Sequence, residues 1–155
     1  IYLTGSYVRD KDGVDGAYMI CEMFSYYATR GISLLDKLDE LYKTYGYCLN
    51  TLHSYEFDGS AGFARMQSIM QAFRGGIKEF GGKKVVRLLD YVQGLDGLPK
   101  SDVLKFLLEN NCSLVVRPSG TEPKLKIYIS VSAENKEMAE KVEDEIAKTV
   151  EKWIC

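Results

Sequence analysis

Two strand-like segments on either side of a short polar stretch constrain the fold more than any other part of this sequence. Residues 113–116 form an apolar run, and in residues 125–131 apolar and polar side chains alternate. Alternation with a period of two is typical of a strand with one buried face. The sequence therefore predicts two strands joined by the polar stretch, residues 117–124, which is called the 117–124 loop below. A loop held between two strands is a rigid place for a binding site.

The 117–124 loop reads Arg-Pro-Ser-Gly-Thr-Glu-Pro-Lys and combines several groups that bind phosphate. The planar guanidinium of Arg117 can hold two phosphate oxygens at once. Ser119 and Thr121 add hydroxyl donors, and Gly120 allows its backbone N–H to approach a ligand closely. The two prolines restrict the backbone, so the loop loses less entropy when a ligand binds. Arg117, Ser119, Gly120 and Thr121 are predicted to bind phosphate, with Lys124 as a further candidate contact.

The rest of the chain predicts helices and strands in an order typical of an α+β domain. Apolar residues at helical spacing predict helices over residues 17–28, 34–45, 60–73 and 134–153. Short apolar or alternating segments predict further strands over residues 47–57, 84–92 and 103–108. The side chains expected to face the core from the last two helices are Phe63, Met66, Met70, Phe73, Met138, Val142, Ile146, Val150 and Trp153. We expect an antiparallel sheet with helices packed on one face, preceded by the first two helices.

A second cluster of charged residues precedes the first predicted helix. Arg9 and Lys11 lie where free backbone N–H groups and the helix dipole attract an anion, which makes both residues candidate contacts to phosphate. Asp12 is interpreted as the N-cap of that helix rather than as a catalytic group. Asp10 is interpreted as a partner of Arg9.

Composition excludes several classes of function. The formal net charge is -2, without the basic stripe expected of a nucleic-acid-binding protein, and no apolar run is long enough to span a bilayer. Cys21, Cys48, Cys112 and Cys155 show no metal or redox spacing and predict reduced cytosolic thiols. His53 is a single histidine without an evident carboxylate or cysteine partner, so it is interpreted as structural or solvent-facing rather than as a general base.

The 117–124 loop, followed by an alternating strand and a terminal helix, resembles the C-terminal domain of the α-D-phosphohexomutases, the phosphoglucomutase and phosphomannomutase family. A second family-like segment, Val-Arg-Asp-Lys-Asp-Gly, occupies residues 8–13. The resemblance implies a TATA-box-binding-protein-like fold for residues 46–155 and assigns residues 1–45 to the end of the third, α/β, domain. It also implies that Lys11 and, with it, Arg9 contact the substrate.

By the same resemblance, the full-length enzyme interconverts hexose 1-phosphate and hexose 6-phosphate through a phosphoserine, with Mg²⁺ and hexose 1,6-bisphosphate as cofactor and intermediate. This chain lacks the serine loop and the aspartate-rich metal loop of that family. It is therefore expected to be an inactive cytoplasmic fragment without catalytic or metal-binding residues. In the full-length enzyme, this part is expected to clamp the phosphate group that is not reacting and to close the active site. Its expected partners are a phosphorylated hexose and the missing N-terminal domains, with dimerisation through the first two helices as a further possibility. The sugar remains open between glucose, mannose and a pentose.

Two other functions remain open from the sequence. The chain could be a stand-alone module that binds a phosphorylated metabolite without catalysis. It could also be a structural fragment in which the 117–124 loop is only a tight turn.

Overall fold

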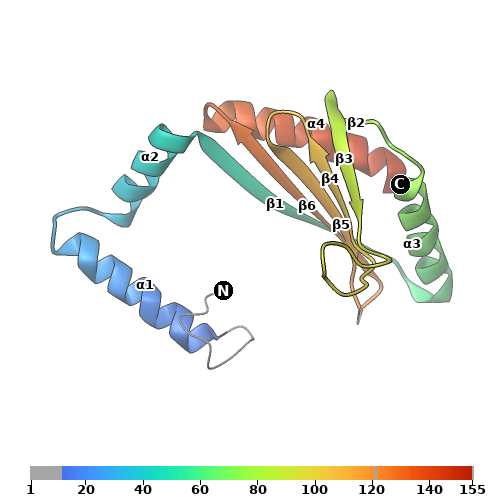
Figure 1. Cartoon of the computed structure of the whole chain (residues 1–155), viewed down its shortest axis with the longest axis horizontal. Helices are drawn as coiled ribbons and strands as arrows, with labels where there is room; N and C mark the ends of the chain where they lie inside the picture. Colours follow the sequence, from blue (N-terminus) through green and yellow to red (C-terminus); the bar gives the residue numbers. More distant parts are fainter. Residues whose placement is uncertain (1–11, 121, 155) are drawn as a thin grey trace. The chain divides into compact units, whose positions relative to one another are not determined.

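The computed structural model describes residues 12–120 and 122–154, and its contacts divide the chain into two compact units, Ile1–Tyr45 and Gly46–Cys155. The first unit contains the two predicted helices, α1 (Gly13–Ala28) and α2 (Leu34–Tyr45) (Figure 1). Asp12 is the N-cap of α1, as predicted, because its Oδ1 accepts hydrogen bonds from the N–H groups of Val14 and Asp15, each at 3.0 Å.

The start of α2 is fixed by a reciprocal pair of side chains. The N–H of Asp36 donates to Ser33 Oγ at 3.0 Å, and the Asp36 carboxylate accepts from the Ser33 hydroxyl at 2.6 Å and from the Ser33 N–H at 3.1 Å. This is a capping box with aspartate as the acidic member. The hydrogen bonds from Ser33 lower the pKa of Asp36 below its ordinary value.

Neither α1 nor α2 buries a residue, and both present large apolar side chains to solvent. Val14, Leu35 and Tyr45 are 83%, 75% and 81% exposed. We expect this 155-residue chain to associate through these helices, because burying such surface is favourable by about 25 cal/mol per Å². Its Tm should then fall on dilution, whereas a shortened chain beginning at Gly46 should show no such dependence. A concentration-independent monomer by light scattering would contradict this expectation.

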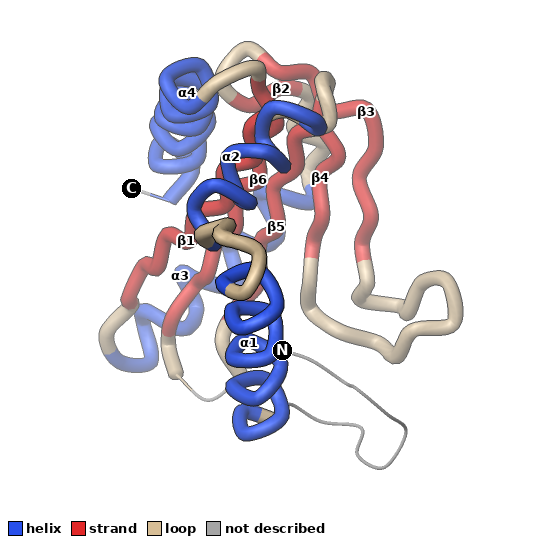
Figure 2. Tube along the Cα trace, turned by 90° about the vertical axis from the view of Figure 1, so that its left-hand side faces the viewer, coloured by secondary structure: helices blue, strands red, loops and turns tan. Residues whose placement is uncertain are grey.

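The second unit is an α+β layer built on one sheet (Figures 1 and 2). Its elements are β1 (Tyr47–Glu56), α3 (Gly59–Arg74), β2 (Glu79–Phe80), β3 (Lys83–Asp90), β4 (Leu104–Leu108), β5 (Cys112–Pro118), β6 (Lys124–Ala133) and α4 (Lys136–Ile154). The strand order is β1-β6-β5-β4-β3-β2, and every neighbouring pair is antiparallel. The expected antiparallel sheet is therefore confirmed.

The core lies between one face of this sheet and the helices α3 and α4. In β5 and β6, buried and partly exposed side chains alternate, and the buried set joins residues of α3 and α4 in one cluster. The fully buried strand residues include Leu104, Phe106, Leu114, Val116, Leu125, Ile127 and Val131. The alternate strand residues point away from α3 and α4, and their surface is called the open face below.

The predicted inward faces of α3 and α4 were wrong in part. Phe63 and Met138 are 56% and 47% exposed, and Trp153 is 44% exposed although its ring centroid lies 6.4 Å from that of the buried Phe73. The residues that α3 buries are Met66, Ile69, Met70 and Phe73, and those that α4 buries are Ala139, Ile146, Ala147, Val150 and Ile154. The small residues Ala139 and Ala147 lie against the sheet because they let the α4 backbone approach it closely, which apolarity alone does not predict.

The short strand β2 was not predicted, although it contributes an important core residue. Phe80 is fully buried, and its ring centroid lies 5.1 Å from that of Phe106 and 6.2 Å from that of Phe73. A two-residue strand carries no periodic signal, so its position depends on this aromatic cluster rather than on local pattern.

Arg74 attaches the end of α3 to the segment between β3 and β4. Its guanidinium donates to Asp90 at 2.9 Å and also to Asp102. Burial disfavours the charge, but the hydrogen bonds to Asp102 and Asp90 outweigh burial and raise the pKa of Arg74 above its ordinary value. Both ends of the β3–β4 connection are thereby fixed at the end of the sheet that carries the 117–124 loop.

Across residues 12–120 and 122–154, no helix is both long and apolar enough to cross a membrane.

Candidate phosphate-binding site

The 117–124 loop closes the hairpin between β5 and β6, as the sequence predicted. Pro118 pairs with Leu125 in the strand register, and the N–H of Ser119 donates to the carbonyl of Lys124 at 2.7 Å. The N–H of Phe57, after the end of β1, donates to the carbonyl of Pro123 at 2.9 Å. The loop is therefore fixed on both sides by backbone hydrogen bonds.

Lys124 makes ion pairs within the protein. Its Nζ lies 3.1 Å from Glu56 and 3.4 Å from Glu122. The hydrogen bond to Glu56, with the nearby charge of Glu122, raises the pKa of Lys124 above its ordinary value. Of these two partners, Glu122 belongs to the 117–124 loop itself and Glu56 to the end of β1. The charge of this lysine is therefore largely balanced without a ligand.

Arg117 is an exposed residue near the end of β5, on the open face of the sheet. Lys126 of β6 lies directly opposite it in the antiparallel register. Residues paired in this way have Cβ atoms about 4.5–5.5 Å apart, and two like charges there repel one another. In the part of the chain that the structure describes, neither residue forms an ion pair with a carboxylate, so the pair leaves two positive charges for a ligand.

The remaining predicted site residues fall into two groups. Gly120 is exposed. Apart from its chain neighbours, no atom of the described residues lies within 4 Å of the position that a Cβ would occupy there, so a ligand can approach its backbone. Ser119 is partly buried beside it. Thr121, Arg9 and Lys11 lie outside the described residues.

Sequence reasoning missed Lys126 as a partner of Arg117. The alternation in residues 125–131 placed it on the polar face of a strand, but only the register between β5 and β6 shows that it lies opposite Arg117. Pairing the two predicted strands outward from the 117–124 loop would have indicated that Lys126 lies opposite Arg117, because loop length sets the register of a hairpin.

The premise about His53 was also wrong, because the histidine has a carboxylate partner. His53 Nε2 lies 2.6 Å from Glu143 Oε1, and the Thr51 hydroxyl donates to the same oxygen at 2.6 Å. The partner is 90 residues away in the sequence, on α4. These contacts join the edge strand β1 to α4 on the helix-covered side of the sheet.

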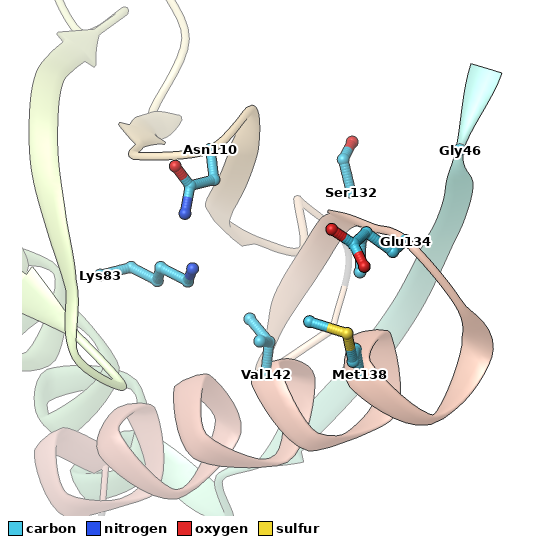
Figure 3. Close-up of a pocket in the computed structure, with 8 residues that line it drawn as sticks. Gly46, Lys83, Asn110, Ser132, Glu134, Met138 and Val142 are labelled. Atoms are coloured by element: carbon cyan, nitrogen blue, oxygen red, sulfur yellow. The ribbon is translucent and has the colours of Figure 1, made fainter.

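A cavity of about 430 Å³ lies at the opposite end of the sheet from the 117–124 loop (Figure 3). The side chains of Lys83, Asn110 and Glu134 surround it, with Met138 and Val142 on the side of α4. Among the predicted phosphate-binding residues that the structure describes, Arg117, Ser119, Gly120 and Lys124 do not line this cavity. Within the described residues, no group of three His, Cys, Asp or Glu side chains could hold a metal ion.

The fold and the loop together define a domain that presents a basic, glycine-containing hairpin loop at the end of an antiparallel sheet. Residues 57–149 match the sequence profile of the phosphoglucomutase/phosphomannomutase C-terminal domain. The chain therefore belongs to the phosphoglucomutase/phosphomannomutase family and contains its C-terminal domain.

Individual relatives agree with this assignment. A phosphoglucomutase of Staphylococcus aureus (strain MSSA476) is 36% identical over 146 residues, covering 86% of this chain and 26% of that protein. A phosphoglucomutase of Staphylococcus saprophyticus is 31% identical with the same coverage. The chain thus spans about a quarter of the length of these relatives.

Among solved structures, the open form of Paramecium parafusin, a phosphoglucomutase, is similar in fold. The TM-score is 0.59 and the identity 18%, and the match covers 96% of this chain and 27% of that protein.

Proposed function

We propose that this chain is the C-terminal part of an enzyme that interconverts hexose 1-phosphate and hexose 6-phosphate, and that it holds the phosphate that is not reacting. The observation that carries this proposal is the pair Arg117 and Lys126, two opposed cations without a described carboxylate partner beside an open Gly120. A phosphate dianion matches both the charge and the donor geometry of this arrangement.

The contribution of each residue follows from its position. The Arg117 guanidinium can donate two parallel hydrogen bonds, which fixes the orientation of a phosphate as well as its position. Lys126 adds a second charge from the neighbouring strand, and Gly120 and Ser119 supply N–H and hydroxyl donors from the loop. Lys124 has a different role, because Glu56 and Glu122 already hold it. It orders the loop rather than binding phosphate directly.

Binding a remote phosphate contributes to catalysis at the other end of the sugar. Interaction energy at a group that does not react can orient the reacting end and offset the entropy lost on binding. The reacting groups belong to the rest of the enzyme, so this chain alone should have no mutase activity. The same proposal includes three further points. Residues 1–45 form the end of a third domain and residues 46–155 a fourth domain, and Arg9, Lys11 and Thr121 contact the substrate. The enzyme is located in the cytoplasm.

Mg²⁺ and hexose 1,6-bisphosphate enter this proposal through the full-length enzyme. Since the described residues offer no cluster of metal ligands, the magnesium site would lie in other domains, and no step assigned to this chain runs through the metal. Those other domains would also supply the phosphoserine, beside which Mg²⁺ would balance the negative charge of the phosphoryl group.

Titration of the chain with glucose 1-phosphate, followed by amide NMR, tests the site directly. We expect shifts centred on residues 117–120 and on Lys126, weakening as salt rises, because part of the attraction is screened. Lys126→Gln should weaken binding about tenfold, the value of one charge-assisted hydrogen bond. Lys124→Gln should weaken it less, since that lysine is already paired.

Glucose without phosphate serves as the control and should cause no shifts. Equal effects of the two lysine variants would contradict the different roles given to Lys124 and Lys126. Tight, saturable binding by the chain alone would favour the alternative of a stand-alone phosphometabolite-binding module. The compact second unit with its own core is the observation that keeps this alternative open.

A further inference from the structure

The cavity at the end of the sheet far from the 117–124 loop combines two opposite charges with an apolar wall (Figure 3). Its volume of about 430 Å³ is within the range of small-molecule sites. The amine of Lys83, the amide of Asn110 and the carboxylate of Glu134 surround it. Met138 and Val142 of α4 form its apolar side. The cavity therefore offers polar and apolar contacts to one ligand.

The sheet register explains how these side chains come together. Val85 lies opposite Leu108, and the backbone hydrogen bond of the next pair, 3.1 Å long, continues this register to Lys83 and Asn110. Both residues are thus neighbours on the helix-covered face of the sheet. Glu134 follows β6 by one residue, three strand spacings from β3, which is roughly 14 Å at the level of the backbone. Lys83 and Glu134 therefore reach into the cavity from opposite sides.

The polar side chains around the cavity have no partner within the protein. Across residues 12–120 and 122–154, no hydrogen bond or ion pair involves the side chain of Lys83, Asn110 or Glu134. By contrast, Lys148 of α4 pairs with Asp144 one turn earlier in the same helix. A polar group that a ligand removes from water must gain a hydrogen bond in return. A ligand in this cavity must therefore satisfy a cation, an anion and an amide.

These requirements disfavour several classes of ligand. A phosphate dianion would be attracted by Lys83 but repelled by Glu134. A neutral sugar would leave both charges without a counter-charge. A metal ion would lack ligands, because the described residues contain no group of three ligating side chains. A zwitterion with an apolar part satisfies the two charges, the amide and the apolar wall together.

We propose that this cavity binds a free α-amino acid with an apolar side chain. The carboxylate of the amino acid accepts hydrogen bonds from Lys83 and Asn110, and its ammonium group donates to Glu134. Its side chain packs against Met138 and Val142, where the burial of apolar area is favourable. The site lies away from the 117–124 loop, so this inference does not depend on the proposed function.

Titration of this chain with L-leucine, followed by amide NMR, tests the site. We expect shifts centred on Lys83, Asn110 and Glu134, with a Kd on the order of 1 mM, since a ligand of this size makes few contacts. Two analogues separate the charged groups of leucine, because isocaproate lacks the ammonium group and isoamylamine lacks the carboxylate. Each analogue should bind at least about tenfold more weakly than leucine.

Variants of the chain give an independent test. Lys83→Gln and Glu134→Gln should each weaken leucine binding about tenfold, the value of one charge-assisted hydrogen bond. The matched controls Lys84→Gln and Glu137→Gln remove the same charges at neighbouring exposed positions that do not line the cavity. These controls should change the affinity for leucine by less than about twofold. Amide spectra of each variant verify that the fold is retained.

Each of the other outcomes overturns the amino-acid site. One is an absence of shifts at the cavity up to the solubility limit of leucine, and another is equal binding of leucine and isocaproate. Shifts at the cavity with glucose in place of leucine would assign it to a neutral sugar. A loss of affinity in the two controls equal to that in Lys83→Gln and Glu134→Gln would show general charge attraction.

Discussion

Replacing Arg117 with alanine in the full-length enzyme should reduce kcat/KM for glucose 1-phosphate on the order of 100-fold. The guanidinium supplies charge-assisted hydrogen bonds to phosphate, and losing about 3 kcal/mol of such bonding corresponds to that factor. Because Arg117 is exposed at the end of β5, the change should leave the free energy of unfolding nearly unchanged. Steady-state kinetics and urea unfolding of the same variant separate the two effects.

Two further variants show what Arg117 contributes. Arg117→Lys keeps the charge but lacks the planar fork, so it should recover only part of the lost kcat/KM. Lys148→Ala on α4 removes a surface charge that has no part in the proposed site and should match the unaltered enzyme. Kinetics of Arg117→Ala equal to those of the parent would refute the assignment of this arginine to phosphate binding.

Replacing Gly81 with alanine should cost about 3 kcal/mol or more of the free energy of unfolding, the largest effect on stability that we expect from one methyl group. A Cβ at Gly81 would lie 2.5 Å from the backbone N of Ile146 and 2.6 Å from the backbone C of Glu145. These are atoms of α4, which cannot move without disturbing the core. The N–H of Gly81 also donates to the Thr149 hydroxyl at 3.1 Å, which fixes the turn against the helix.

Gly82 provides a matched control within the same turn. Both glycines have positive φ, 54° at Gly81 and 75° at Gly82. Among the described residues, however, no atom outside its chain neighbours would lie within 4 Å of a Cβ at Gly82. Gly82→Ala should therefore lower the free energy of unfolding by only about 1–2 kcal/mol, the cost of placing an alanine in the left-handed backbone conformation. Urea unfolding of the second unit should show the two variants about 2 kcal/mol apart. Equal destabilisation would mean that backbone strain, not the approach of α4, limits this turn.

Much of the fold could be predicted because its segments carry strong local patterns. The alternation in β6, the helical spacing in α1 and α2, and the caps at Asp12 and Ser33 each depend on residues close in the sequence. The strand β2 could not be predicted in this way, since its two residues are placed by the distant rings of Phe73 and Phe106. Likewise, Ala139 and Ala147 of α4 are buried because the helix lies close to the sheet, and not because alanine is strongly apolar.

By itself, the sequence determined the α+β class, the hairpin that carries the 117–124 loop, and the chemistry of that loop. The physical reason is that strand alternation, turn residues and the donors of Arg117 are properties of a few consecutive residues. Tertiary structure alone decided which cations are available to a ligand. It placed Glu56 from β1 against Lys124, and it placed Lys126 opposite Arg117, because ion pairs and cross-strand neighbours depend on register between segments.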